Sequence, residues 1–363
     1  MTPTMDALGH DVMGRRAAEA WPLARALLLE PPGPEWRPGH GGVIATGVGS
    51  SEAHARYLVG LLRQHASVPA WFEPLSAFLD PGFPGPATAG RTLVVFSQGL
   101  AANARVALER RRDFASVVVM TSATVAGQER AGRPERAVIL RSLVAEGGRV
   151  ERFPEEDEYA ILVRLIGPLC GFAAAWRLAS CVRGHSLGTA QDLVEQLDAW
   201  AAGPWPHRML AGIEEALEAH RAGFVVATGP GLGGCAENVV AKFVEGLYWR
   251  GPRVVDLLAL AHGHLQQLMA RPEPVWVLGD CALARRVEEV LAGAGLPARR
   301  VPLPGRVEVA PLAAELLLNP VLLGLARRLG VDQVNWPGKG MDGGLYGISR
   351  REDVDDAKRS GSL

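Results

Sequence analysis

The pentapeptide Ala-Thr-Gly-x-Gly occurs twice in this chain, each time directly after a short apolar run. The two copies are residues 45–49 and 227–231. A short Val-rich run is typical of a buried strand in a parallel sheet, and the glycines after it allow the backbone to turn sharply. The same order of strand, glycines, helix and strand surrounds both copies, which indicates an internal duplication. We therefore predict an α/β chain of two tandem domains, each a parallel sheet flanked by helices.

The length and composition limit the classes of function. A chain of 363 residues exceeds the usual single core, and its net charge of −1 offers no basic excess for binding nucleic acid. No apolar run approaches the length of a membrane span, and the polar residues 1–16 do not resemble a signal peptide. The four cysteines are scattered without a Cys-x-x-Cys spacing, so we expect reduced thiols in a cytoplasmic protein and no zinc site.

Further apolar runs predict the remaining elements. Strands are expected at residues 43–46, 70–72, 92–96, 116–120 and 137–140, at the run that opens at Phe224, and at 275–278. Helices are expected at residues 5–29, 53–65, 101–112, 159–181 and 190–202. Strands that alternate with helices imply parallel sheets that bind ligands at the carboxyl ends of their strands.

Turn-forming residues within 184–206 suggest the boundary between the domains. The expected division is an N-terminal helical segment at 1–35, a first domain at 36–200 and a second domain at 201–349. Residues 350–363 are charged and nearly without apolar side chains, which predicts a disordered tail. The acidic run at residues 155–158 precedes an expected helix, so we interpret it as N-terminal helix charge rather than as a metal site.

The glycine-rich stretch after the run at Phe224 is a candidate ligand site. Unpaired amides at the start of the following helix suit an anion or a sugar, and Lys242 and Glu245 share one face of that helix. Two other interpretations stay open. The glycine spacing of residues 229–234 also fits a dinucleotide fingerprint, although no acidic residue ends a strand about 20 residues later. Lys242 and Glu245 also fit an ordinary ion pair on a helix surface.

Several motifs, taken in order along residues 40–340, resemble those of the double sugar isomerase (SIS) family. The family includes the isomerase half of glutamine–fructose-6-phosphate aminotransferase. The matching segments are Gly49-Ser50-Ser51, Ser97-Gln98-Gly99-Leu100-Ala101-Ala102, Lys242-Phe243-Val244-Glu245, His262-Gly263, and Asp332-Gln333 with Lys339 seven residues after Asp332.

The resemblance implies roles for these residues. Glu245 would move a proton between C1 and C2 of a sugar, and His262 would open the sugar ring from across the interface of a homodimer. Lys339 would contact the C2 carbonyl or form an imine with it, and Lys242 would assist by its charge. Neither a metal nor a cofactor is implied. The expected substrate contacts are Gly49, Ser50, Ser51, Ser97, Gln98, Ser122, Thr124 and Gly231.

The chain also departs from the family pattern. Gly99 and Ala102 stand where the family's phosphate loop has Ser and Thr, so two hydroxyl donors are missing and the substrate's phosphate is in question. No catalytic Cys follows Met1, so we expect no glutaminase activity. Three functions stay open: a sugar or amino-sugar isomerase acting through an enediol, a ketosamine deaminase or deglycase, and a non-catalytic regulator that binds a sugar or a nucleotide.

Overall fold

The computed structural model describes residues 7–80, 82–154 and 160–341, which form two compact units. Unit 1 consists of the described residues in the segments 1–29, 157–169 and 188–335. Unit 2 consists of the described residues in the segments 30–156, 170–187 and 336–363. The strands of one sheet all precede residue 200 and those of the other all follow it. The continuous domain boundaries expected from the sequence stay a prediction. The acidic run at 155–158 and the tail at 350–363 lie outside the described residues.

Unit 2 contains a five-stranded parallel sheet in the order β2-β1-β3-β4-β5. Its strands are β1 (Val43–Thr46), β2 (Ala70–Phe72), β3 (Thr92–Phe96), β4 (Ser116–Thr121) and β5 (Arg149–Arg152). The strand order reverses between β1 and β3, and ligands bind at the carboxyl ends of strands at such a point in open α/β sheets. The loops that follow β1 and β3 are therefore the first place to look for a ligand site.

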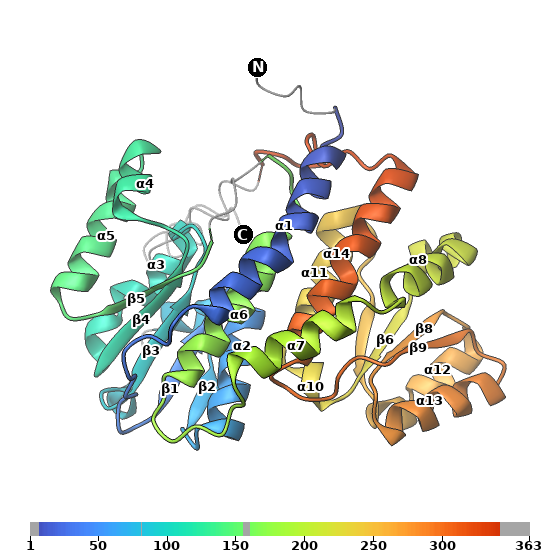
Figure 1. Ribbon diagram of the computed structural model, residues 1–363, viewed down its shortest axis with the longest axis horizontal. Helices are drawn as coiled ribbons and strands as arrows, with labels where there is room; N and C mark the ends of the chain where they lie inside the picture. The colour runs from blue at the N-terminus through green and yellow to red at the C-terminus, as the bar shows by residue number, and fades with distance from the viewer. Residues whose placement is uncertain (1–6, 81, 155–159, 342–363) are drawn as a thin grey trace. The chain divides into compact units, whose positions relative to one another are not determined.

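Four α-helices of unit 2 surround this sheet (Figure 1). They are α2 (Ser50–His65), α3 (Ala102–Glu109), α4 (Val125–Arg130) and α5 (Pro134–Ala145). Short 3₁₀ turns are η1 (Leu75–Leu79), η2 (Pro86–Thr88) and η3 (Arg111–Asp113), and α6 (Ile166–Ser180) contributes residues to both units.

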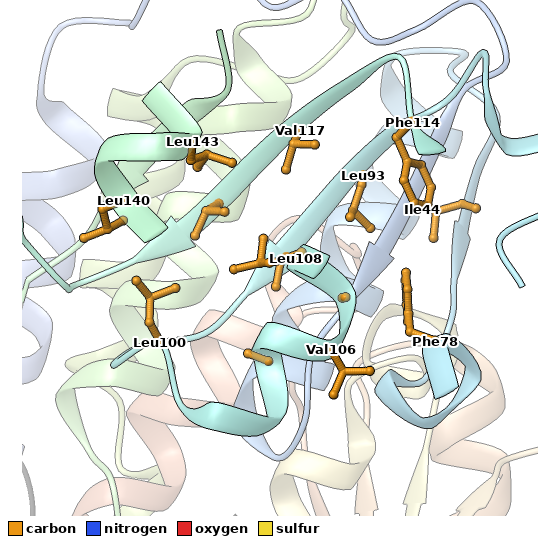
Figure 2. Packing of buried hydrophobic residues seen from close by; sticks show 14 of the residues in the cluster. Ile44, Phe78, Leu93, Leu100, Val106, Leu108, Phe114, Val117, Leu140 and Leu143 are labelled. Carbon is orange, nitrogen blue, oxygen red and sulfur yellow. The ribbon is translucent and has the colours of Figure 1, made fainter. Parts of the chain in front are cut away.

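One face of the unit 2 sheet packs against α3 and α5. Figure 2 shows Ile44, Leu93 and Val117 on the strands, close to Leu108 of α3 and Leu143 of α5. All residues of β1 and β3 are buried, as their unbroken apolar runs predict for central parallel strands. The burial of this face fixes the sheet, and the sheet in turn holds the loops at its carboxyl edge.

Two expectations for the first half of the chain are wrong. Residues 137–140 belong to α5, where Pro134 lies in the first turn and Ala137, Leu140 and Leu143 are buried at a spacing of three, as on one face of a helix. The strand in this region is β5, whose edge position leaves its mostly charged side chains partly exposed, so it has no apolar run. The long helix expected at 159–181 is also shorter, because α6 begins at Ile166.

Unit 1 contains a four-stranded parallel sheet in the order β7-β6-β8-β9. Its strands are β6 (Val225–Thr228), β7 (Arg253–Asp256), β8 (Val275–Leu278) and β9 (Ala298–Val301). This order repeats the β2-β1-β3-β4 part of the other sheet, with the reversal between β6 and β8. The chain therefore has the two parallel sheets flanked by helices that the duplicated pentapeptide predicts, with β1 and β6 as equivalent strands.

Several helices of unit 1 pack against α14, the longest apolar helix of the second half. Their bounds are α1 (His10–Leu29), α7 (Ala190–Ala201), α8 (Trp205–Glu215), α9 (Leu217–Ala222), α10 (Pro230–Gly233), α11 (Ala236–Leu247), η4 (Ala259–Ala261), α12 (His264–Ala270), α13 (Ala282–Gly293) and α14 (Ala310–Leu329). In Figure 1, α14 lies beside α1 and α11, and it also packs against α7 and α8.

By length and composition α14 alone, within the described part of the chain, could span a membrane. However, 72% of its most apolar window is buried inside the fold, as in the core helix of a soluble domain. Its buried side chains include Glu315 and Asn319, which matter for the site described next.

Candidate active site

The loop between β6 and α11 needs glycine where it approaches another backbone segment. Gly231 lies in α10, and a Cβ atom built on it would be 2.4 Å from the carbonyl oxygen of Gly305. No side chain fits at this distance, so Gly231 is required by packing. A contact between Gly231 and a substrate, as expected from the sequence, stays a prediction.

Lys242 of α11 lies in a buried polar network. Its Nζ atom is 2.8 Å from Glu315 Oε2, and it donates to Asn319 Oδ1 at 2.8 Å and to the carbonyl oxygen of Arg164 at 2.7 Å. The side chains of Lys242 and Glu315 are only 3% and 1% exposed. Because an ammonium has three N–H donors, these three acceptors use all of them. Lys242 can therefore act on a substrate only through its charge and through the position of α11.

Asn238 completes this network one turn earlier on α11. Its Nδ2 atom donates to Glu315 Oε1, so Asn238 and Lys242 hold both oxygens of one carboxylate. The two side chains are four residues apart and share one face of the helix. Glu315 and Asn319 of α14 thus join α11 to α14 by buried polar contacts as well as by apolar packing.

Glu245 follows Lys242 by three residues on the same helix. Burial raises the pKa of Glu245, while the positive charges of Lys242 and Arg164 act in the opposite direction. Among the described residues its carboxylate has no hydrogen bond or ion pair, although its side chain is partly buried. A carboxyl group whose pKa is moved toward neutrality can both accept and return a proton near pH 7.

Gln333 fixes the end of α11. It is fully buried, and its Nε2 atom donates to the carbonyl oxygens of Glu245 and Gly246 at 2.9 and 3.0 Å. Its Oε1 atom accepts from the backbone of Val163 at 3.0 Å. Sequence reasoning did not assign this role to Gln333, although the Asp332-Gln333 pair was part of the matched motif. Glu315, Asn319 and Asn238 were missed altogether.

Tyr248 caps α11 in the left-handed conformation and contacts the same segment. Its hydroxyl donates to the carbonyl oxygen of Asp332, and Gln333 Nε2 lies 3.4 Å from it. Burial, followed by the charge of Asp332, raises the pKa of Tyr248 to about 12. The residues after α14 therefore tie down the carboxyl end of the helix that carries Glu245.

His262 lies on the surface of unit 1. It is exposed and follows η4, and Gly263 after it adopts a φ of 88° that starts α12. No hydrogen bond of its side chain is present among the described residues. An exposed imidazole is free to serve a second subunit, but its place across a dimer interface stays a prediction.

Lys339 belongs to unit 2, whereas Glu245 and His262 belong to unit 1. Lys339 is exposed between Gly338 and Gly340, and its Nζ atom lies 4.5 Å from the centre of the Trp336 ring. The expected assembly of Glu245, His262 and Lys339 around one substrate thus stays a prediction.

The loop after β1 begins α2 with Gly49, Ser50 and Ser51. Gly49 is the N-cap residue, with a φ of 62° that favours glycine, and both serines lie in the first turn of α2. No side-chain hydrogen bond caps this helix start. The position of the two hydroxyls beside helix amides suits the binding of a polar ligand.

The loops after β3 and β4 bring Ser97, Gln98 and Ser122 together. Ser97 Oγ accepts from the backbone of Ala101 at 3.2 Å, and the Gln98 carbonyl oxygen accepts from both the backbone and the hydroxyl of Ser122, at 3.0 and 2.8 Å. Thr124 lies further along and caps α4 by accepting from Gly127 N at 2.9 Å. Three of the expected contact residues are thus adjacent at the carboxyl edge of the sheet, and Thr124 has a structural role at least.

A cavity of about 410 Å³ in unit 2 lies elsewhere. Its lining includes Ser116, at the amino end of β4, together with Arg111 and Glu146. The opposite, carboxyl edge carries the loops described above, so this cavity is not the candidate active site. In the described part of the chain, no group of three or more His, Cys, Asp or Glu side chains is placed to hold a metal ion.

No family model and no curated protein matches this sequence. Solved structures do match its fold. The C-terminal domain of glucosamine-fructose-6-phosphate aminotransferase from Francisella tularensis aligns with a TM-score of 0.63 at 13% identity, covering 88% of this chain and 97% of that one. Glucosamine-6-phosphate deaminase from Thermotoga maritima aligns with a TM-score of 0.61 at 15% identity, covering 90% and 97%.

A candidate phosphosugar isomerase from Clostridium difficile 630 aligns with a TM-score of 0.61 at 12% identity, covering 92% of this chain and 96% of that one. All three matches extend over nearly the whole of both chains, so they include both sheets. The resemblance that the sequence motifs suggested is confirmed at the level of the fold: this chain has the double sugar isomerase (SIS) fold.

Proposed function

We propose that this chain is an SIS-type enzyme that isomerises a sugar or amino sugar by moving a proton through an enediol. The observation that carries the proposal is Glu245, an unpaired and partly buried carboxyl group whose pKa is raised by its burial. It lies on a helix held in place by buried contacts at Lys242 and Gln333. The similar folds of a candidate phosphosugar isomerase and of a glucosamine-6-phosphate deaminase support this chemistry.

In the proposed mechanism each residue acts through its own atoms. The Glu245 carboxylate removes a proton from one carbon of the substrate and returns it to the next, on the same face of the enediol. His262 transfers the proton that opens the ring, and Lys339 polarises the carbonyl or forms an imine with it. Lys242 positions α11 and contributes its charge, because its three donors are already used.

The proposed enzyme is a homodimer in the cytoplasm, in which His262 of one subunit completes the site of the other. It uses neither a metal nor an organic cofactor. No nucleic acid and no membrane take part.

Release of an amine is the second candidate function. It is favoured by the similarity in fold to a glucosamine-6-phosphate deaminase. A deaminase releases an amine from its substrate, whereas an isomerase releases no group. A ketosamine bound by the same residues would release its amine on hydrolysis by water, with Lys339 at the carbonyl.

Exchange of deuterium at C2 of the sugar tests the proposal. A panel of amino sugars and plain sugars, with and without phosphate, first identifies a ligand by its effect on the unfolding temperature. The C2-deuterated ligand is then incubated with the enzyme, and loss of the label is followed by mass spectrometry. We expect loss of label with the unmodified chain, no loss with Glu245→Gln, and an unchanged rate with Glu237→Gln, an exposed glutamate on the same helix.

The pH dependence adds a second readout. Because the base must be ionised, the rate of label loss should rise with pH through a value above the ordinary glutamate pKa of 4.5. Release of ammonia or of an amino acid would instead identify the amine-releasing function. Tight binding without loss of label would identify a non-catalytic regulator and would refute the isomerase.

A further inference from the structure

The cavity of about 410 Å³ in unit 2 lies at the amino edge of its sheet. Its lining comes from two turns that lead into neighbouring strands. Residues 111–112 and 114–117 run from η3 into β4, residues 146–148 lead from α5 to β5, and Leu143 of α5 completes the wall. The loops of the candidate active site follow the opposite, carboxyl ends of the strands, so a ligand in this cavity would occupy a separate site. Its volume is within the range of small-molecule sites in proteins.

The buried part of the lining is apolar. Phe114, Val117 and Leu143 are at most 8% exposed and belong to the core of this unit, as Figure 2 shows. Gly147 adds no side chain to the cavity: its φ is 82°, and a Cβ atom built on it would meet no atom within 4 Å. An apolar ring or chain placed here would be removed from water against apolar side chains.

One polar wall of the cavity is an ion pair whose charges cancel. Arg111 donates from Nε and Nη2 to the two oxygens of Glu146, each at 2.8 Å, and Ser142 Oγ donates to Glu146 Oε1 at 3.0 Å. The hydrogen bond from Arg111, followed by that from Ser142, lowers the pKa of Glu146 to about 2. The carboxylate is therefore ionised near neutral pH, and Arg111 is already held by it.

Arg112 brings a positive charge that this pair does not neutralise. Its Nη2 atom is 3.6 Å from Glu146 Oε1, which is too far for a hydrogen bond, and that oxygen already accepts from Arg111 and Ser142. The nearest carboxylate along the chain, Asp113, pairs with Arg110 at 2.8 Å. The charged side chains that line the cavity are two guanidinium groups and one carboxylate, so their net charge is +1.

From this arrangement we propose that the cavity is a second ligand site, which binds a small organic anion with an apolar ring or chain. The apolar part of the ligand contacts Phe114, Val117 and Leu143, and Arg112 binds its anionic group. A guanidinium presents a planar fork of donors that matches the oxygens of a carboxylate, a sulfonate or a phosphate, and it stays charged at every physiological pH. The site is independent of the proposed function, because none of these residues takes part in that reaction.

A pair of fluorescent probes tests the proposal. Anilinonaphthalene sulfonate is an anion with apolar rings, and phenylnaphthylamine has the same rings without the sulfonate. We expect the sulfonate to bind at one site per chain, more tightly than the neutral probe, and to lose affinity as the salt concentration rises. Arg112→Gln should weaken the sulfonate by about threefold to tenfold, as for an exposed charge-assisted contact, and leave phenylnaphthylamine unchanged.

Three further variants locate the bound probe. Ala115→Trp places an indole in the cavity from an exposed lining position and should prevent the binding of both probes. Arg112→Lys keeps the charge and should retain more affinity for the sulfonate than Arg112→Gln does. Arg63→Gln, which removes an exposed arginine of α2, should bind like the unmodified chain. The urea midpoint of each variant shows that it is folded.

Displacement of the bound sulfonate identifies the anionic group. Benzoate and phenyl phosphate should displace it, and the better of the two shows which anion the site prefers, whereas benzyl alcohol should not.

Four results would overturn the proposal. They are no binding of the sulfonate, an effect of Arg112→Gln that is absent or equal for both probes, unchanged binding in Ala115→Trp, and displacement by benzyl alcohol as effective as by benzoate. Unchanged binding in Ala115→Trp would mean that the probes bind elsewhere on the chain.

Discussion

Replacing Glu315 by glutamine is expected to destabilise unit 1 by about 3–5 kcal/mol, because the Lys242 ammonium would stay buried without a counter-charge. The two charged atoms are 2.8 Å apart, and both side chains are at most 3% exposed. At an effective dielectric constant of about 20, this distance corresponds to an attraction of about 6 kcal/mol.

Urea denaturation followed by far-ultraviolet circular dichroism measures this loss. With a slope of about 2 kcal/mol per molar, the expected penalty lowers the midpoint by roughly 1.5–2.5 M. The matched control is Glu214→Gln, which breaks the pair of Glu214 with Arg328 of the same helix α14. Because the Arg328 side chain is 59% exposed and its ion pair is 3.4 Å long, the control should cost at most about 1 kcal/mol.

Equal shifts of the urea midpoint in Glu315→Gln and Glu214→Gln would refute the reasoning. They would mean that the buried Lys242–Glu315 pair contributes no more to stability than an exposed pair. A Lys242→Met, Glu315→Met double variant extends the test. Removing both charges should be less harmful than Glu315→Gln alone, since an apolar pair leaves no buried charge behind.

Three other predictions concern single groups. Burial lowers the pKa of His220, whose Nε2 accepts from Trp276 at 3.0 Å. As the pH falls, the unfolded chain therefore binds a proton at this histidine at a higher pH than the folded chain does. The urea midpoint should fall as the pH drops below the ordinary histidine pKa of 6.5, and His220→Gln should reduce this dependence. Gly231→Ala places a Cβ 2.4 Å from Gly305 O and should cost about 1–3 kcal/mol; an unchanged urea midpoint would contradict it. Ultraviolet titration of Tyr248, by difference from Tyr248→Phe, should show a midpoint of about 12.

The fold was predictable from the sequence where burial alone decides the structure. The central strands β1, β3 and β8 have the expected bounds, because residues in the middle of a parallel sheet form short apolar runs between turn signals. The edge strand β2 also has the expected bounds. The expectation failed at the edge of the first sheet. There β5 is made mostly of charged residues, and the apolar run nearby, residues 137–140, belongs to α5. An apolar run of this length does not distinguish a helix from a strand.

The candidate site was predictable only in part. Local motifs pointed to Glu245 and to the loops after β1 and β3, because the residues of each motif are only a few positions apart in the sequence. The buried partners of Lys242 were not predictable, since Glu315 lies 73 residues away inside a mostly apolar helix. Arg136 contacts the loop at Gly99 from 37 residues further along, with no motif of its own. The first contact arises from packing of α11 against α14 and the second from packing of α5 against a loop, and a single sequence encodes neither locally.

The candidate residues differ in what their substitution can reveal. Lys242 and Gln333 are buried and hold α11 in place, so a loss of activity on changing either of them would combine chemistry with stability. Glu245 makes no hydrogen bond or ion pair among the described residues, and its burial opposes the charged form. Glu245→Gln should therefore leave the fold as stable as before or slightly more stable. A loss of proton transfer in that variant, with an undiminished urea midpoint and an unchanged ligand affinity, identifies the loss of the base.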